Sequence, residues 1–248
     1  MINNSSTLHT DYSSRQIRAK ENLGESAVPG SGFNFGMTSE RTCLRMLDRL
    51  REKGIRDEDV LAAMAAVPRH QFLDEALASR AYEDTALPIG LGQTISQPFI
   101  IAFMIAALRK GRAQLGKTLE VGAGCGYQAA ILGRLSGEVH SVERISALHA
   151  KAQEQLQALA IPHVRIHLSD GEQGYPPAAP FDSIIVAAAA EYIPQALTRQ
   201  LALGGRLIMP LSEGEHKQYL CVVDNAVHGL VINRSEAVRF VPLKSGVV

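Results

Sequence analysis

The chain has 248 residues with 25 basic and 25 acidic side chains, so its formal net charge is zero. This length suffices to bury the core of one large or two small domains. Because the basic residues are balanced and scattered, the composition argues against a nucleic-acid face and against attraction to an anionic membrane. No apolar run reaches the length that spans a bilayer.

The three cysteines, Cys43, Cys125 and Cys221, are isolated from one another and form no CxxC or Cys/His motif. The histidines likewise show no metal-ligand spacing, and no Ser-His-Asp order or G-x-S-x-G turn indicates a hydrolase. We therefore expect reduced thiols, no bound metal and a cytoplasmic protein rather than a disulfide framework.

Residues 1–36 are rich in Ser, Asn, Gly and charge, and they contain no apolar segment of the kind that signal peptides have. Their few apolar residues cannot form a core, so we expect a disordered N-terminal extension. A single domain is then expected over residues 37–248. Its helical and substrate-loop part is expected at 37–112, and its cofactor-binding sheet at 113–248.

Two amphipathic helices are predicted ahead of Pro68. The first is expected to start near Ser39 and to end at Gly54. Its buried stripe would consist of four apolar residues, Cys43, Leu44, Leu47 and Leu50. The second is expected to begin after Asp57 and to stop before the proline, which disfavours helical backbone in the residue ahead of it.

Residues 85–98 are predicted to form a loop, because they hold two prolines, two glycines and several small polar side chains. Pro98 suits the first position of a following helix. That helix is expected to bury Phe99, Ile100, Phe103, Met104 and Ala107. A polar, glycine-bearing loop beside a nucleotide site is a candidate substrate lid. The alternative, that Thr94 and Ser96 merely cap this helix, is equally well supported by composition alone.

The stretch from Thr118 to Glu143 has the pattern of one βαβ unit of a parallel sheet. An apolar run meets Gly122, Gly124 and Gly126, a helical segment follows, and a second apolar run ends at the acid. Glycines permit a sharp turn and a close approach of the backbone to a ligand. Glu143 stands 21 positions after Gly122, where a carboxylate can accept hydrogen bonds from both hydroxyls of a ribose.

The same residues indicate which class of nucleoside ligand the site would bind. The dinucleotide fingerprint G-x-G-x-x-G is incomplete, because Tyr127 stands at its third glycine position, and no Lys-Ser/Thr pair of a P-loop opens the helix. Glu120 places a negative charge beside the loop, which disfavours a pyrophosphate and suits a cationic ligand. S-adenosylmethionine has a ribose, no phosphate and two positive groups, so it fits best. A plain glycine turn is the weaker alternative, because the helix and the distal acid are both present.

The rest of the chain predicts a further alternation of helices and strands. Strands are expected at 163–168, 181–188 and 206–211, and a helix after Glu143 would be capped by Ser146. Another helix would start at Pro194 and end at the Gly204-Gly205 pair. A hairpin is expected from 219–223 and 230–232, with a last strand at 237–241. The sequence therefore predicts an α/β, doubly wound, mostly parallel sheet with a C-terminal antiparallel hairpin and extra N-terminal helices.

Seven segments, in order, resemble the protein-L-isoaspartate O-methyltransferase family: VPRHQFLDEAL, RAYEDTALPIGLGQTISQPFI, LEVGAGCGYQAAIL, SVERI, APFDSIIVAAAA, GGRLIMPL and AVRFVPL. The resemblance extends from about Thr38 to Leu243. Its specific part is GQTISQP, because glycine-triplet motifs occur throughout the methyltransferases and this loop is particular to the repair enzyme. The chain departs from the family pattern at residues 123–125, where Ala-Gly-Cys replaces the usual Thr-Gly-Ser, and at Ala187, where Thr is frequent. Neither change removes a backbone donor.

The resemblance implies a Rossmann-like, S-adenosylmethionine-dependent methyltransferase fold. It also implies a repair reaction, in which a methyl group passes to the free α-carboxylate of L-isoaspartyl residues in damaged proteins and peptides. The ester then cyclises to a succinimide, which can reopen to aspartate. On this resemblance Ser96 is the expected catalytic residue, because it would orient the carboxylate together with Thr94, while Gly90 and Gly92 let the loop close.

The same resemblance gives Asp170, which with Gly171 would otherwise be a plain turn, a role in reaching the adenine amino group. The residues expected in the cofactor site are Thr94, Glu120, Gly122, Gly124, Gly126, Glu143, Asp170 and Gly171. Two other classes compete with this assignment. The first is a methyltransferase of a small molecule or of RNA, and the second is an NAD-dependent oxidoreductase or a non-catalytic nucleotide sensor. The GQTISQP loop and the neutral charge argue against the first. Tyr127 and the lack of an acid/base pair for hydride transfer argue against the oxidoreductase, and the complete loop argues against the sensor.

Overall fold

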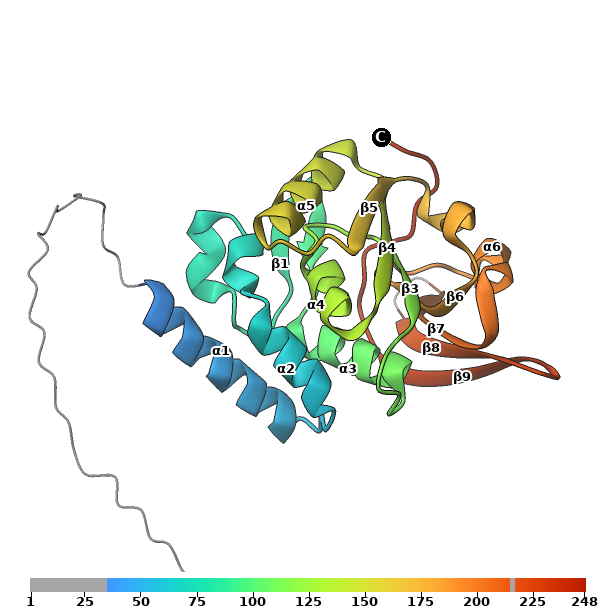
Figure 1. Ribbon diagram of the computed structural model, residues 1–248, viewed down its shortest axis with the longest axis horizontal. Helices are drawn as coiled ribbons and strands as arrows, with labels where there is room; N and C mark the ends of the chain where they lie inside the picture. Colours follow the sequence, from blue (N-terminus) through green and yellow to red (C-terminus); the bar gives the residue numbers. More distant parts are fainter. Residues whose placement is uncertain (1–34, 215–216) are drawn as a thin grey trace, which may run out of the picture. The chain divides into compact units, whose positions relative to one another are not determined.

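A seven-stranded sheet is the centre of the structure, a computed structural model that describes residues 35–214 and 217–248. The strand order is β5-β4-β3-β6-β7-β8-β9 (Figure 1). The strands are β3 (Lys117–Val121), β4 (Glu138–Glu143), β5 (Val164–Leu168), β6 (Phe181–Val186), β7 (Leu201–Glu213), β8 (Lys217–Ala226) and β9 (Gly229–Ala237). All pairs from β5 to β7 are parallel, and β8 and β9 continue the sheet antiparallel. The predicted sheet and its C-terminal hairpin are confirmed.

The chain reverses its direction of travel across the sheet between β3 and β6. From β3 it moves outward through β4 to the edge strand β5, and it then returns to β6 on the other side of β3. Helices α4 (Tyr127–Leu135) and α5 (Ser146–Ala158) form the first two crossovers, and α6 (Gln195–Arg199) lies between β6 and β7. In such sheets a ligand crevice opens beyond the carboxyl ends of the strands, where the order reverses.

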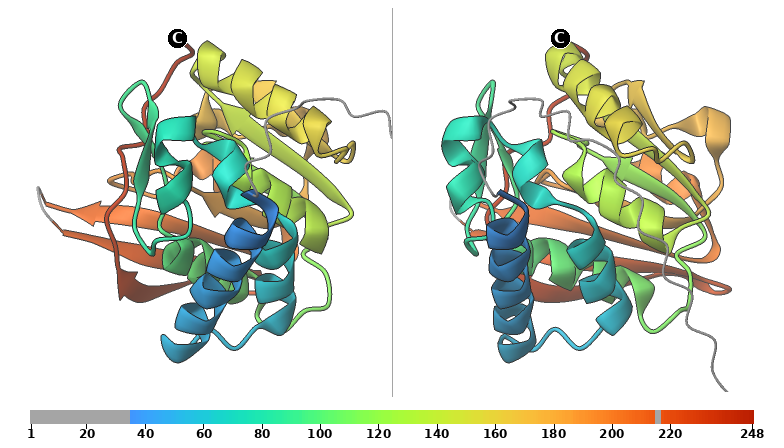
Figure 2. Two further views of the ribbon diagram at one scale, coloured as in Figure 1. Left: turned by 90° about the vertical axis from the view of Figure 1, so that its left-hand side faces the viewer. Right: turned by 60° about the vertical axis from the view of Figure 1, so that its left-hand side comes forward.

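Two hydrophobic clusters cover the two faces of this sheet. The larger joins one face to α4, α5 and the N-terminal helices α1 (Phe35–Glu52), α2 (Glu58–Ala66) and α3 (Pro98–Arg109). The smaller packs α6 against the other face. Along β6, Ile184 belongs to the smaller cluster and Ile185 to the larger, so this strand is buried on both faces. Figure 2 shows helices on either side of the strands.

The N-terminal helices form where they were predicted, but they turn partly different faces inward. Asp57 caps α2 by accepting the N–H of Val60, and Pro98 is the first residue of α3. In α1 the buried stripe contains Met46 in place of Leu44, whose side chain is 54% exposed. α3 buries Ile101, Ala102, Met104, Ile105 and Leu108. Because α3 is apolar on almost every side, its sequence period could not identify this face.

Residues 85–98, predicted as a loop, contain a short antiparallel hairpin. It is formed by β1 (Leu87–Gly90) and β2 (Gln93–Ile95). The turn residues Gly90, Leu91 and Gly92 have φ angles of 90°, 54° and 69°. The prediction of a loop was wrong because these strands are so short that their alternation of buried and exposed positions is hidden by the glycines and prolines.

The Gly204-Gly205 pair does not end a helix, as had been predicted. α6 stops at Arg199, and β7 already begins at Leu201 and runs through both glycines. A Cβ on Gly205 would lie 2.8 Å from the carbonyl oxygen of Ala202, so this glycine allows a close backbone contact within the irregular start of the strand.

The predicted last strand at 237–241 is also wrong. β9 ends at Ala237, and the chain then leaves the sheet edge and passes over the carboxyl ends of the parallel strands. There Pro242 forms an isolated bridge with Ala189. Residues 1–34, the greater part of the expected N-terminal extension, lie outside the described residues, and residues 35–248 form one compact unit.

Candidate active site

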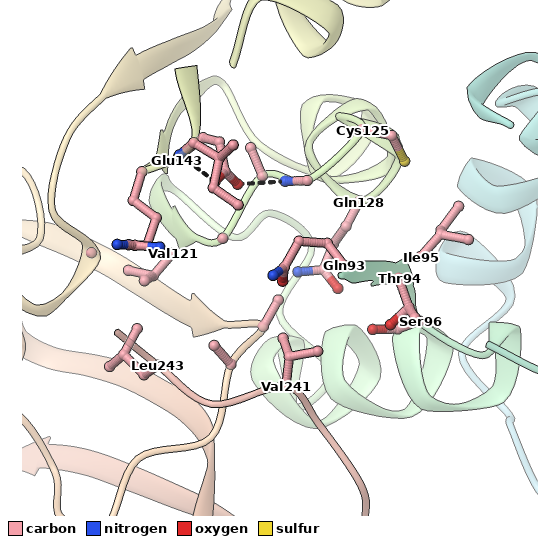
Figure 3. A pocket seen from close by; sticks show the side chains of 18 of the residues that line it. Gln93, Thr94, Ile95, Ser96, Val121, Cys125, Gln128, Glu143, Val241 and Leu243 are labelled. Carbon is pink, nitrogen blue, oxygen red and sulfur yellow. Dashed lines mark hydrogen bonds between the residues drawn. The ribbon is translucent and has the colours of Figure 1, made fainter. Parts of the chain in front are cut away.

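A cavity opens at the carboxyl ends of the parallel strands, beside the point where the strand order reverses. The space within its lining, part of it open to solvent, amounts to about 860 Å³. Much of its wall comes from three parts of the chain: the glycine loop after β3, residues 93–96 of the hairpin, and residues 241–244 (Figure 3).

The glycine loop folds back onto the end of strand β4. Gly122 donates its N–H to the carbonyl of Val142 at 2.9 Å. Gly122, Gly124 and Gly126 have φ angles of 91°, 55° and 87°, a region that residues with a Cβ rarely adopt. A Cβ on Gly124 would lie 3.2 Å from the Cδ1 atom of Ile89 in β1. The loop therefore needs these glycines both for its turn and for its approach to the hairpin.

Glu143 ends strand β4 with its carboxylate at the cavity wall (Figure 3). Its Oε2 accepts the N–H of Gly124 and its Oε1 accepts the N–H of Ile145, both at 2.9 Å. Since each oxygen has a second lone pair, the carboxylate can still accept hydrogen bonds from a ribose. The predicted cap of α5 by Ser146 is wrong, because Ile145 holds the cap position and no side chain caps the helix.

Glu120 lies behind the glycine loop and does not line the cavity. Its carboxyl is fully buried and accepts a hydrogen bond from the hydroxyl of Ser141. Burial raises the pKa of Glu120 to about 7, although the Ser141 hydroxyl and Gln128 lower it in part. The negative charge that was expected beside the loop is therefore weakened near neutral pH. Gln128, which does line the cavity, stands between this acid and the ligand space.

Asp170 and Gly171 have separate roles in the structure. Gly171 lines the cavity, and a Cβ there would lie 2.6 Å from Cγ1 of Val121. The carboxylate of Asp170 is not part of the wall: Oδ1 accepts the N–H of Glu172 at 2.9 Å and Oδ2 accepts that of Gly246 at 2.8 Å. Asp170 thus fastens the C-terminal segment beside the cavity.

The segment 238–248, which we call the tail, was not expected to reach this site. Residues 241–244 form part of the cavity wall. Arg144 fastens the tail by donating Nε to the carbonyl of Gly246 at 2.8 Å and Nη2 to that of Ser245 at 3.2 Å. The backbone N–H of Val248 also bonds to the Arg144 carbonyl at 2.9 Å. No pattern in the sequence indicated this position, because an isolated apolar run at the end of an α/β chain resembles another strand.

The side chains of Thr94 and Ser96 enter the cavity from the hairpin. Because they are two positions apart at the end of a strand, they share one face. Figure 3 shows them side by side, away from Glu143 in this view. Neither hydroxyl makes a hydrogen bond within the described part of the chain, so both are available to a ligand. The structure therefore brings these two predicted residues together with the glycine loop in one cavity.

Two residues that fix the backbone around Ser96 were not found from the sequence. Arg69 donates Nη2 to the carbonyl of Ser96 at 2.8 Å, and Asp84 accepts the N–H of Phe99 at 2.8 Å. Burial favours the protonated form of Asp84, but Lys53 and the Phe99 N–H outweigh it and lower the pKa of this carboxyl. Sequence spacing cannot reveal these contacts, because they connect separate turns that only the folded chain brings together.

The described residues contain no group of three or more His, Cys, Asp or Glu side chains placed to hold a metal ion. Among the helices of residues 35–214 and 217–248, none combines the length and the apolar character needed to cross a membrane.

The site and the fold together define a class. A glycine loop at the reversal point, followed by an acid at the tip of the next strand and lacking the third fingerprint glycine, belongs to the Rossmann-like S-adenosylmethionine-dependent methyltransferases. The glycine backbone and the free lone pairs of Glu143 fit the ribose of a nucleoside.

Comparison with known proteins gives the particular family. The sequence profile of Protein-L-isoaspartate(D-aspartate) O-methyltransferase (PCMT) matches residues 41–248. A protein-L-isoaspartate O-methyltransferase of Dechloromonas aromatica is 61% identical over 212 residues, which are 86% of this chain and 97% of the relative. That of Methylobacillus flagellatus is 54% identical over 214 residues, covering 86% and 96%.

Solved structures agree with these relatives. One, described as a protein-L-isoaspartate O-methyltransferase from Plasmodium falciparum in complex with S-adenosyl-L-homocysteine, has a TM-score of 0.72 at 28% identity and covers 81% of this chain and 97% of its own. A second protein-L-isoaspartate O-methyltransferase has a TM-score of 0.75 at 27% identity, with coverages of 83% and 67%.

The chain therefore belongs to the protein-L-isoaspartate(D-aspartate) O-methyltransferase family. The resemblance noted in the sequence, the methyltransferase fold and the dependence on S-adenosylmethionine are confirmed. The classification as a protein carboxyl O-methyltransferase that acts in the repair of isoaspartyl damage is confirmed with them.

Proposed function

We propose that methyl transfer to the free α-carboxylate of an L-isoaspartyl residue takes place in the cavity of Figure 3, with Ser96 and Thr94 holding that carboxylate. The observation that supports these roles is the placement of two available hydroxyls opposite the glycine loop within one cavity. One side of the cavity then holds the cofactor, and the other presents hydrogen-bond donors to the substrate carboxylate that accepts the methyl group.

On the cofactor side, the groups that would hold S-adenosylmethionine are the carboxylate of Glu143, which suits the ribose hydroxyls, and the backbone of Gly122 and Gly124. When bound, the cofactor supplies a methyl group on a positively charged sulfur. Glu120 and Asp170 lie outside the cavity wall, where the Glu120 carboxyl accepts from the Ser141 hydroxyl of β4 and the Asp170 carboxylate accepts from Gly246 of the tail.

On the acceptor side the chain needs no strong base. A substrate carboxylate is already ionised at neutral pH and is therefore a ready nucleophile. The hydroxyl of Ser96 would donate a hydrogen bond to one carboxylate oxygen and thereby aim the other, while Thr94 limits its rotation. Catalysis then depends on alignment and on the exclusion of water by the hairpin and the tail.

The partners follow from the same reasoning. We propose isoaspartyl-containing proteins and peptides as substrates and the cytoplasm as location. The cytoplasmic location is supported by the equal numbers of acidic and basic residues and by the three free, buried cysteines. Because many flanking sequences must be accepted, the polypeptide is expected to bind in extended form through its backbone.

The test uses two peptides that differ only in an L-isoaspartyl or an L-aspartyl residue, together with labelled S-adenosylmethionine. Base-labile label on the isoaspartyl peptide alone is the expected result. If neither peptide is labelled while S-adenosylhomocysteine still binds, the cofactor site stands and the substrate assignment is overturned.

A further inference from the structure

Arg69 is a buried cation whose contacts are made with main-chain oxygens. Its side chain is fully buried within the short helical turn η1 (Arg69–Phe72). Nε donates to the carbonyl of Ala81 and Nη2 to that of Ser96, each at 2.8 Å. No carboxylate of residues 35–214 and 217–248 forms an ion pair with it. Burial accordingly lowers the pKa of this guanidinium.

The same guanidinium also touches the cofactor side of the site. Its central carbon lies 4.9 Å from the centroid of the Tyr127 ring. Tyr127 is the first residue of α4, immediately after the glycine loop, and it lines the cavity. Phe72 packs edge-on against this ring at 5.4 Å, so the ring is held from a second direction. Arg69 thus connects the exit of the hairpin to the exit of the glycine loop.

Such an arrangement is poorly suited to stability alone. A buried charge without a charged partner loses its hydration, and an apolar side chain of similar volume is commonly as stable or more so. The planar fork of arginine, in contrast, can fix two carbonyl groups and lie on an aromatic face at once. That combination favours a role in geometry over a role in stability.

We infer that Arg69 is a positioning residue for methyl transfer, which holds the Ser96 main chain against Tyr127 and so sets the distance between the Ser96 hydroxyl and the cofactor loop. The inference rests on the role proposed above for Ser96. Because transfer needs the reacting groups aligned within about half an ångström, a small drift of the hairpin exit slows turnover more than it weakens binding.

The experiment compares Arg69→Met, Ser96→Ala and the double variant, with Arg69→Lys as a variant that keeps the charge but not the fork. We expect Arg69→Met to lower kcat by about 100-fold, while its affinity for S-adenosylhomocysteine stays within about threefold of the wild type. The kcat of Arg69→Lys is expected to lie between those of Arg69→Met and the wild type. The double variant is expected to be no slower than the slower single variant, since both changes remove the same alignment.

Arg49→Met is the matched control. Arg49 also donates from a guanidinium to a main-chain carbonyl of this region, that of Tyr82 at 2.6 Å, but within residues 35–214 and 217–248 it forms no hydrogen bond with the hairpin exit. Its kcat is expected to remain within about twofold of the wild type, and its effect is expected to add to that of Ser96→Ala. Melting temperatures of all variants separate a loss of folded protein from a loss of turnover.

The outcomes distinguish this inference from the proposal on which it rests. If Ser96→Ala has the turnover of the wild type, both the proposed role of Ser96 and the inference about Arg69 are overturned. A slow Ser96→Ala variant with near wild-type Arg69→Met, or with effects that multiply in the double variant, would overturn the inference and leave Ser96 in place. If Arg69→Met does not fold, the comparison with Ser96→Ala and the double variant is made with Arg69→Lys instead. Effects on kcat that multiply in that double variant would likewise overturn the inference.

Discussion

The two sides of the cavity are built in different ways. On the cofactor side, Gly124 bonds to Glu143 and Gly122 to Val142, so a stretch of about twenty residues forms its own binding loop on buried strands. On the acceptor side, the hairpin tip is exposed, with Leu91 at 60%, and its exit is held by Arg69 and by Asp84 from other parts of the chain. One side is a loop bonded to buried strands, and the other is an exposed hairpin whose exit is held by side chains that lie outside it.

This difference separates binding from alignment. Because the glycine loop is held by its own strands, we expect it to bind the cofactor even when the hairpin exit has shifted. The hairpin, in contrast, carries the two hydroxyls proposed to bind the substrate carboxylate, and its position depends on the residues that hold its exit. Changes on the first side should therefore appear in cofactor affinity, and changes on the second side in turnover.

Glu143→Gln is expected to have the largest effect on the cofactor side. The amide nitrogen cannot accept a hydrogen bond, so either Gly124 or Ile145 loses its acceptor and the ribose loses an ionised partner. Charge-assisted hydrogen bonds of this kind contribute about 1.5–3 kcal/mol each, so the affinity for S-adenosylhomocysteine should fall by about 100-fold. Isothermal titration calorimetry measures this affinity in the variant and in the wild type.

Glu138→Gln is the control for that variant, because Glu138 lies at the opposite end of the same strand and pairs with Arg165 at 2.8 Å. Its affinity for the ligand should stay within about twofold of the wild type. Equal losses in the two variants would show that the strand as a whole, rather than the carboxylate of Glu143, supports binding.

Asp84→Ala should have a smaller effect, and it should fall on turnover. Without this carboxylate the N–H of Phe99 loses its acceptor at the start of α3 and Lys53 loses its ion pair, so the hairpin exit loosens. We expect kcat to fall by about tenfold with cofactor affinity unchanged. Glu83→Ala removes only the exposed pair with Arg80, and it should leave kcat unaffected.

Arg144→Ala tests the tail and should have a still smaller effect. Loss of its bonds to the carbonyls of Gly246 and Ser245 frees a segment that forms part of the cavity wall. Dissociation of S-adenosylhomocysteine, followed by stopped flow, should become about fivefold faster. Arg134→Ala, an exposed arginine in the last turn of α4, should not change this rate.

The pH dependence of stability should involve the sheet and leave the cavity unaffected. The ring of His167 in β5 stacks on the ring of Tyr175, with 3.8 Å between their centroids. Its Nε2 lies 3.0 Å from Nδ1 of His140. Burial, followed by the charges of His140 and Arg165, lowers the pKa of His167 from 6.5 to about 4. The unfolded chain therefore binds this proton first, so the contribution of His167 to stability is complete above pH 6.5 and falls as the pH drops towards 4.

His167→Gln should weaken that dependence. Between pH 6.5 and 4.5 its melting temperature should fall by about 3 °C less than that of the wild type, while kcat at neutral pH is unchanged. His228→Gln, in the exposed turn between β8 and β9, serves as control. Identical pH profiles of His167→Gln and the wild type would show that this imidazole does not contribute.

The local half of the site was accessible from sequence because its signals lie within one stretch. The glycine positions, the strand before them and the acid after them follow directly from backbone geometry and periodicity. Thr94 and Ser96 were expected in the site, but the strands of their hairpin, the path of the tail and the contacts of Arg69 were not, since these depend on how separate parts of the chain pack together. Asp170 and Glu120, both expected in the cofactor site, lie outside the cavity wall, with carboxylates that accept from Gly246 and Ser141.

The most direct test of the division between the two sides is a pair of measurements on Ser96→Ala: the dissociation constant of S-adenosylhomocysteine and kcat on an isoaspartyl peptide. Our account predicts a dissociation constant within about threefold of the wild type and a kcat at least about 100-fold lower. Thr85→Ala, outside the cavity at the start of the same segment, should change neither. Wild-type turnover in Ser96→Ala, or a parallel loss of affinity, would contradict the account.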